Sequence, residues 1–226
     1  SKLRSASKSM TLISLTLVLS TVLFALSPAL SGWAEGYLEE RAIYDVQINS
    51  YYNNVLRQED LPQDTYDFVP AFLEARGIQI TQDRVFSLYL PEASQFHNRN
   101  KYDFPVVAVA LSDYNAIRQM LGYPPISLGA REFSTQWDAI STPEDQAAFL
   151  RNHPTLSTDA GTLSLSQDAL HTESMGETFY NLYTHVTYVL PDQVCHQLLP
   201  VMTKRYLATA HPIPYADAAA LQDAFS

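Results

Sequence analysis

The feature that most constrains this chain is a stretch near its N-terminus, residues 9–34, that contains no charged side chain. Its apolar centre runs from Met10 to Leu30, and a helix of this length, with about 1.5 Å rise per residue, extends about 31 Å. The hydrocarbon core of a bilayer is roughly 30 Å thick. The stretch therefore predicts a membrane-spanning helix over residues 10–33.

Two other interpretations of this stretch stay open. A cleaved signal peptide would have a shorter apolar core of about 7–15 residues, although Ala29-Leu30-Ser31 would serve as a cleavage site. A buried helix of a water-soluble domain would have a polar face, whereas the polar side chains here are serines and threonines. Their hydroxyls bond back to helix carbonyls and are tolerated in lipid. The length and composition favour the membrane-spanning helix.

The charges on either side of the stretch predict its orientation. Basic residues precede it, and acidic residues outnumber basic ones directly after it: Lys2, Arg4 and Lys8 before, and Glu35, Glu39, Glu40 and Arg41 after. An excess of Lys and Arg marks the cytoplasmic side of a membrane helix. We therefore expect residues 1–9 to form a cytoplasmic basic flank and residues 34–226 to lie outside the cell.

The part that follows, residues 34–226, is long enough for one domain or two small ones. It carries 11 basic and 24 acidic residues, a formal charge of −13. This charge argues against nucleic acid as a partner, because no basic stripe is present to displace counterions from phosphates. It is compatible with a cationic peptide or metal ions, although an acidic surface also serves solubility.

Cysteine usage excludes an intramolecular disulfide, because Cys195 is the sole cysteine of the chain. It lies at helical spacing among apolar residues in VLPDQVCHQLLP, which predicts a buried, small hydrophobic side chain. The low cysteine content and the lack of an Asn-x-Ser/Thr sequon favour a bacterial source.

Hydrophobic periodicity predicts strands alternating with short helices after residue 42. We expect strands at residues 42–51, 78–90, 104–111 and 179–190, and a hairpin over 156–165 that turns at 159–161. We expect helices that extend the membrane helix over 36–42, open at Leu61 for about 14 residues, run from Ser112 or Asp113 to Met120, and cover 143–152, 193–199 and 214–225. Gly77 and Gly122 are suited to end two of these helices.

Two units stand out because a buried strand leads directly into a helix opened by an acidic residue. One comprises residues 106–110 followed by Ser112-Asp113, and the other residues 186–190 followed by Pro191-Asp192. Together with the other elements they predict an α+β domain of mixed sheets and short helices behind the membrane helix. We also expect a subdomain over about residues 132–176.

No motif assigns a catalytic, cofactor-binding or metal-binding residue. The six histidines lack the spacing of a zinc-protease helix, and no Gly-x-Ser-x-Gly elbow is present. Cys195 and His196 are adjacent, so on a helix they point about 100° apart and form no dyad. The seven glycines form no phosphate-binding loop. The sequence therefore predicts neither an enzyme nor a cofactor.

The order of the segments resembles a known family. A basic SKLRSASKSM leads into the apolar stretch, which continues through SGWAEGYLEERAIYDVQI into a large outer domain with the units FPVVAVALSDYNAIRQMLG and YVLPDQVCHQLLP. This arrangement is similar to the FtsX-like permeases of bacterial ABC transporters, which include MacB-like and bacitracin-resistance-type permeases. In them a membrane helix leads into a large extracytoplasmic domain, and the chain then returns to the membrane.

The resemblance implies that the chain is a piece of a permease in a Gram-positive cell membrane. Its outer domain would sense or bind a substrate or partner and couple through the helix to a cytoplasmic ATPase, which hydrolyses ATP on a separate chain. The implied partners are that ATPase, the lipid bilayer, a peptide or cell-envelope ligand, and a second permease. The alternative is a single-span sensor or adhesion ectodomain with no transport role.

Overall fold

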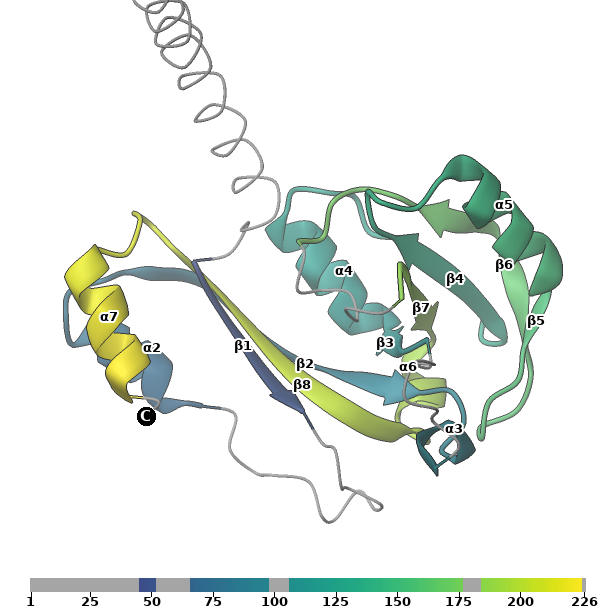
Figure 1. Ribbon diagram of the computed structural model, residues 1–226, viewed down its shortest axis with the longest axis horizontal. Coiled ribbons are helices and arrows are strands. Elements are labelled where there is room, and N and C mark those ends of the chain that lie inside the picture. The colour runs from purple at the N-terminus through teal and green to yellow at the C-terminus, as the bar shows by residue number, and fades with distance from the viewer. Residues whose placement is uncertain (1–44, 52–65, 98–105, 177–183, 225–226) are drawn as a thin grey trace, which may run out of the picture. The chain divides into compact units, whose positions relative to one another are not determined.

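The computed structural model describes residues 45–51, 66–97, 106–176 and 184–224 (Figure 1). Residues Ala42–Ser226 form one compact unit, separate from Ser1–Arg41. The helices predicted at residues 10–33 and 36–42 lie outside the described residues. Within the described ranges, no helix combines the length and the apolar character needed to cross a bilayer.

The described residues form a mixed α/β fold around one sheet of eight strands, in the order β1-β8-β2-β3-β7-β4-β6-β5. The strands are β1 (Val46–Tyr51), β2 (Ile80–Leu90), β3 (Ala108–Ala110), β4 (Glu132–Trp137), β5 (Thr155–Leu156), β6 (Leu163–His171), β7 (Val186–Leu190) and β8 (Leu199–Thr209). The pairs β3–β7 and β4–β6 are parallel, and the other neighbours are antiparallel. The expectation of mixed sheets with short helices is confirmed at this level.

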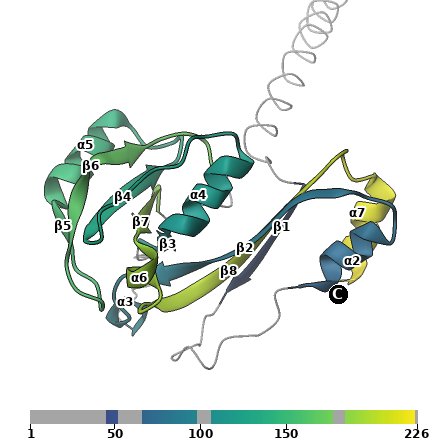
Figure 2. The same cartoon turned by 180° about the vertical axis from the view of Figure 1, so that it is seen from behind.

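The helices are α2 (Phe68–Glu74), α3 (Ser94–His97), α4 (Leu111–Met120), α5 (Pro143–Asn152), α6 (Asp192–Cys195) and α7 (Tyr215–Ala224). Tyr114 and Ile117 of α4 pack on one face of the sheet, against a cluster that includes Met202. Leu207 lies five positions further along β8 and therefore points to the opposite face. There it packs with the buried residues of α2 and α7, two helices that lie side by side in Figures 1 and 2.

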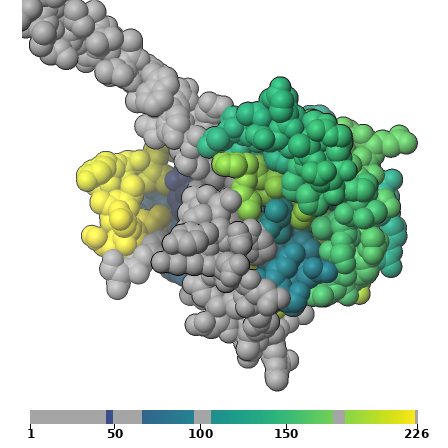
Figure 3. All heavy atoms as spheres, turned by 45° about the vertical axis from the view of Figure 1, so that its right-hand side comes forward, coloured from purple at the N-terminus to yellow at the C-terminus, as the bar shows by residue number. Residues whose placement is uncertain are grey.

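A third cluster fills the sheet face beneath α5 and α6. It includes Phe133 of β4, Leu190 of β7, and Val194 and Cys195 of α6. Cys195 is fully buried, so the prediction of a small hydrophobic side chain at this position is confirmed. Burial raises the pKa of its thiol. The outer side of α5 remains on the surface (Figure 3).

Several predicted elements are confirmed. Strand β1 lies within the predicted range 42–51, α5 matches residues 143–152, and β5 pairs with β6 as the predicted hairpin. Gly77 and Gly122 follow α2 and α4 with φ angles of 73° and 77°, as glycines that end helices do. Thr142 caps α5, because its hydroxyl oxygen accepts a hydrogen bond from the Asp145 N–H at 3.2 Å.

The predicted helix of about 14 residues from Leu61 is confirmed only in part, since residues 61–65 lie outside the described residues and the helix does not continue through Tyr66. Helix α2 has seven residues and begins at Phe68. Tyr66, two positions earlier, has φ 62°, a left-handed conformation that interrupts a right-handed helix. Val69 and Leu73 are the buried residues of α2.

The predicted caps and ends of the two strand–helix units also need correction. The N-cap of α4 is Ala110, which makes no side-chain capping bond, so neither Ser112 nor Asp113 is the cap. The helix predicted at 193–199 ends at Cys195, and Leu199 begins β8 instead. Strand β3 covers only Ala108–Ala110 of the predicted range 104–111, since Leu111 is already helical.

Two strands have no counterpart among the sequence predictions, β4 and β8. Strand β8 pairs with β1 on one side and β2 on the other, and it carries Lys204 and Arg205 at its centre. Strand β4 lies between β7 and β6, and its Ser134, Thr135 and Gln136 are completely buried. Both strands are rich in polar or charged residues, which hides the apolar alternation typical of strands.

Candidate ligand cleft

The candidate site is a cleft of about 530 Å³ beside α4, a volume in the range of small-ligand pockets. Its walls come from the loop after α4 and from the end of β6 with the residues that follow it. The residues that line it are Arg118, Pro124, Pro125, Ile126, Ser127, Asp168, Leu170, His171, Thr172 and Glu173.

The loop wall is fixed by local sequence. Gly122 ends α4, and Pro124-Pro125 prevents the helix from continuing. The loop then runs back along α4, where the Asn115 side chain bonds both backbone groups of Ile126. The Asn115 Nδ2 donates to the Ile126 carbonyl at 2.9 Å, and the Ile126 N–H donates to Asn115 Oδ1 at 2.8 Å. The apolar wall is therefore held by a two-bond clamp.

Arg118 lies at the base of the cleft and is 2% exposed. Its Nε donates to the Pro124 carbonyl at 2.7 Å, one terminal nitrogen donates to the Tyr114 hydroxyl at 3.2 Å, and the other donates to Glu173 Oε1 at 2.7 Å. The hydrogen bond from Arg118 lowers the pKa of Glu173 to about 2. Each guanidinium nitrogen thus has a protein partner, and the Arg118 charge is balanced by Glu173.

A hydrogen-bond chain fixes this base to the sheet. The Tyr114 hydroxyl donates to Gln136 Oε1, and Gln136 Nε2 donates to the backbone carbonyls of Glu173 at 2.9 Å and Trp137 at 3.0 Å. The chain joins α4, β4 and the segment after β6. Buried polar networks of this kind are rigid when their members are paired.

His171 ends β6 and is 6% exposed. Burial lowers the pKa of His171, which keeps its imidazole neutral near pH 7. The ring bonds to the backbone of Asp168, while its Nε2 has no hydrogen-bond partner.

A second buried polar atom beside the cleft is Glu173 Oε2. Because the charges of Arg118 and Glu173 cancel, the exposed carboxylate of Asp168 leaves the cleft with a net negative charge. Within the described residues, no cluster of three His, Cys, Asp or Glu side chains is placed to hold a metal ion. The cleft therefore combines the apolar wall of Pro124, Pro125 and Ile126 with an acidic one.

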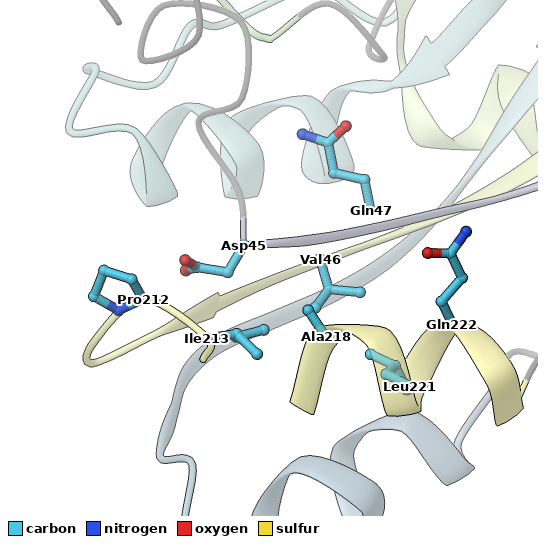
Figure 4. Close-up of a pocket in the computed structure, with 8 residues that line it drawn as sticks. All are labelled: Asp45, Val46, Gln47, Pro212, Ile213, Ala218, Leu221 and Gln222. Atoms are coloured by element: carbon cyan, nitrogen blue, oxygen red, sulfur yellow. The ribbon is translucent and has the colours of Figure 1, made fainter. Parts of the chain in front are cut away.

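A second hollow, of about 610 Å³, lies where β1 begins, between β1, the segment after β8, and α7 (Figure 4). It is lined by Asp45, Val46, Gln47, Pro212, Ile213, Ala218, Leu221 and Gln222. Asp45 Oδ2 accepts a hydrogen bond from the Thr209 N–H at 2.8 Å, and Leu221 packs in the cluster below. The side chain of Asp45 therefore joins the beginning of β1 to the end of β8.

The two predicted strand–helix units meet in the structure. Strands β3 and β7 are parallel neighbours, so α4 and α6 begin at the same end of the sheet, beyond the C-terminal ends of these strands. There Asp192 Oδ1 accepts a hydrogen bond from the Ser112 N–H at 2.9 Å, and Asp113 pairs with Arg84. Burial raises the pKa of Asp113. Asp113 and Asp192 lie in the first turns of α4 and α6, and each bonds a residue of a neighbouring element.

Sequence analysis named no site residue and considered the histidines only as zinc ligands. In the structure His185 Nδ1 lies 2.7 Å from Asp138 Oδ2, whereas His196 is exposed. The residues it missed are Arg118, His171 and Glu173. They come from segments about 50 positions apart and match no motif spacing, so the available signal was only the Pro124-Pro125 break after an amphipathic helix.

Comparison with known proteins identifies no relative of this chain. No family model matches it, and neither a curated protein nor a solved structure does. What the domain does must therefore be inferred from its own residues.

Proposed function

We propose that this chain is part of an FtsX-like permease of a bacterial ABC transporter. Residues 10–33 span the cell membrane with the N-terminus in the cytoplasm, and residues 34–226 form the extracytoplasmic domain. The support from the sequence is the charge-free stretch with basic residues before it and acidic residues after it. In this function the chain is non-catalytic, and ATP hydrolysis belongs to a separate cytoplasmic subunit.

The observation that carries the proposal is the place of β1 in the sheet. Strand β1 is the first described element after the charge-free stretch, and it pairs with β8 from Val46↔Leu207 to Tyr51↔Met202. Strand β8 pairs in turn with β2 from Ile80↔Thr209 to Leu90↔Leu199. A displacement of the segment before β1 would therefore load the backbone hydrogen bonds of these three strands.

The first and last strands along the chain, β1 and β8, are also joined where β1 begins and β8 ends. The Asp45 N–H donates to the Leu207 carbonyl at 3.0 Å, and Asp45 Oδ2 accepts from the Thr209 N–H. A domain inserted between membrane helices needs its incoming and outgoing segments close together. Such a domain couples two distant sites when each of them biases the same two-state element.

The direct experiment is affinity capture of the complete protein from bacterial membranes in mild detergent. We expect an ABC ATPase subunit in the captured material, identified by mass spectrometry. The matched control is the domain alone, residues 42–226 without the membrane segment, which should capture none. Recovery of a single-span protein with no ATPase would overturn the proposal and favour a sensor or adhesion ectodomain.

A second arm examines the role of β1. Ile48 is 9% exposed and packs with Val69, Leu73 and Leu207. Ile48→Asp should loosen β1 without touching the membrane segment, so the ATPase should still be captured while its response to an external ligand is lost. Ile140→Asp, at a residue that is 60% exposed, is the matched control and should change neither readout.

A further inference from the structure

We infer that the segment that leads from β8 into α7, residues 210–215, docks on the outer surface of the lipid bilayer. This contact is a second attachment of the domain to lipid, separate from the membrane-spanning helix. The inference rests on the proposed function for the premise that residues 10–33 cross the membrane. It is carried by the place, the charge, the exposed side chains and the backbone pairing of the 210–215 segment.

The first argument is the place of this segment in the domain. Pro212 and Ile213 line the same hollow as Asp45, where β1 begins (Figure 4). Residues 35–44 separate Asp45 from the charge-free stretch. An extended chain spans at most about 3.6 Å per residue, so this connection reaches about 40 Å at most. The beginning of β1 therefore stays close to the bilayer, and the 210–215 segment lies next to it.

The second argument is the lack of charge. Residues 206–216 contain no Asp, Glu, Lys or Arg, although residues 34–226 carry a formal charge of −13. Two acidic residues beside the segment are bonded within the domain. Asp217 pairs with Arg76 at 3.3 Å, and Asp45 accepts a hydrogen bond from a backbone N–H at 2.8 Å. Since no basic group is available to attract anionic lipid, the contact of this segment with a bilayer is apolar.

The third argument is the exposed side chain of Tyr215. It is 89% exposed, more than any other large hydrophobic side chain among the described residues. Tyrosine is enriched at membrane–water interfaces, because its ring is apolar and its hydroxyl stays hydrated. A single exposed hydrophobic residue is common on protein surfaces and needs no explanation. Tyr215 carries weight because it continues an uncharged segment with Pro212, Ile213 and Pro214.

The fourth argument is the backbone of the segment. An unpaired peptide group is costly to move out of water. Pro212 and Pro214 have no N–H group. The Ala210 N–H donates to a carbonyl just before β2 at 2.9 Å, the His211 carbonyl accepts from a threonine hydroxyl at 2.7 Å, and the Pro214 carbonyl accepts from two N–H groups of α7 at 3.0 Å. These groups therefore lose no hydrogen bond to water when the segment enters the interface.

The membrane helix makes a weak contact sufficient. A surface tethered to the bilayer by a short connection meets lipid at a high effective concentration, so docking needs little affinity of its own. One tyrosine and a few apolar neighbours bury too little surface to hold a free domain on lipid. The full chain in a bilayer is therefore the form in which docking is measured.

The test measures lipid contact at single positions of the full chain in phosphatidylcholine nanodiscs. Tyr215→Cys is labelled with a fluorophore, and part of the lipid carries a nitroxide quencher near its headgroup. Cys195 is fully buried, and the unsubstituted protein is the labelling blank. We expect the quencher to lower the emission of the label at position 215 by about half or more. An unquenched label at this position would overturn the proposal.

Ser94→Cys is the matched control position. Ile80 of β2 pairs with Thr209, whereas Ser94 is exposed and lies beyond the other end of β2, after Leu90. A strand of 11 residues is about 36 Å long. The quencher should therefore lower the emission at position 94 by less than about one tenth. Equal quenching at both positions would overturn the assignment to the 210–215 segment.

A second probe position tests the role of the ring. With the label on Pro212→Cys, Tyr215→Ser should reduce quenching about twofold or more, and Tyr215→Phe should retain it, because phenylalanine keeps the apolar ring. Quenching that is unchanged in Tyr215→Ser contradicts the role of the tyrosine in docking.

Extraction of the membranes with alkaline carbonate separates the two proposals. Retention of the chain in the membrane with an unquenched label at position 215 overturns this inference alone. Release of the chain overturns the proposed function and this inference together. A label that enters an apolar environment without being quenched by lipid would identify a protein partner at this segment, and the docking on lipid would be wrong.

Discussion

Two buried arginines occupy different environments in this domain. Arg205 of β8 donates to both carboxylate oxygens of Asp83, at 2.9 and 2.6 Å, and to Asp67 at 2.6 Å. Arg118 of α4 is equally buried, but the cluster around it leaves His171 Nε2 and Glu173 Oε2 without partners. The comparison teaches that a buried charge does not mark a binding site by itself.

The role of the Arg205 cluster is structural. Asp83 belongs to β2 and Asp67 precedes α2, so Arg205 ties β8 to its neighbour strand and to the helix on that face. The hydrogen bonds that Arg205 donates to Asp83 and Asp67 raise the pKa of Arg205 and keep it charged. Lys204, the preceding residue, points to the opposite face and forms no ion pair among the described residues.

The largest expected effect is at the paired cluster. Arg205→Met removes three charge-assisted hydrogen bonds to Asp83 and Asp67 at a side chain that is 7% exposed, which should cost about 3 kcal/mol of unfolding free energy. Urea unfolding of residues 42–226, the compact unit, measures it. The exposed Arg151→Met is the control, expected within about 0.5 kcal/mol of the natural protein. A loss below about 1 kcal/mol in Arg205→Met would contradict the structural role of the Arg205 cluster.

The next effect has the opposite sign. Lys204 is 2% exposed, and burial lowers its pKa to about 7. Lys204→Met should therefore stabilise the domain by about 2 kcal/mol at pH 7, since no ion pair is lost and a desolvated amine is removed. The same urea titration measures the gain. A loss of stability would show that the amine has a favourable partner.

Lys204 also predicts a pH dependence in the alkaline range. Between about pH 7 and 10 the unfolded chain holds a proton at this lysine that the folded chain releases, so stability should rise with pH. Below about pH 7 both states bind the proton, and the contribution becomes constant. Lys204→Met should flatten this rise, and an equally steep rise in the variant would contradict the assignment to Lys204.

Acid pH tests the cleft cluster with a smaller effect. The folded pKa of Glu173 is lowered to about 2 by Arg118, so its contribution is complete above the ordinary value of 4.5 and is lost as pH falls toward 2. The side chain is 37% exposed, so solvent screening reduces the loss to about 1 kcal/mol. The unfolding free energy, measured from pH 5 to pH 2.5, should depend less on pH in Glu173→Gln than in the natural protein.

The smallest effect is expected at His171. Replacement by phenylalanine keeps the ring volume and removes the unpartnered Nε2, at the cost of the bond to the Asp168 backbone. Since the losses and gains nearly cancel, His171→Phe should change the unfolding free energy by about 0.5 kcal/mol or less. Thermal unfolding by circular dichroism measures it. A loss as large as that of Arg205→Met would assign His171 to the framework instead of the site.

Much of the local structure was predictable because its signals are local. The Pro143 start of α5, the turn between β5 and β6 and the glycines after α2 and α4 each depend on a few adjacent residues. The strands β4 and β8 were not predictable in this way. The buried hydroxyl of Thr135 is satisfied because it donates to the Ala169 carbonyl at 2.5 Å, and this partner is far away in sequence.

The cleft was invisible to sequence reasoning for the same reason. His171 becomes a buried, neutral imidazole only because β6 pairs with β4 and places it near Tyr114, with ring centroids 6.3 Å apart. In the sequence, nothing distinguishes Arg118 from any other basic residue in the last turn of a helix. Its commitment to Glu173 depends on where the chain lies after β6.

The sequence by itself determined the charge-free stretch, the strongly acidic outer part, the burial of Cys195, the position of α5 and the glycines that follow α2 and α4. These depend on composition and on periods of two or 3.6 residues, which act over short distances along the chain. Only the tertiary structure decided which strand joins β1 to the sheet, and which buried charges are paired. Pairing depends on side chains that meet across the fold, and no local pattern encodes their distances.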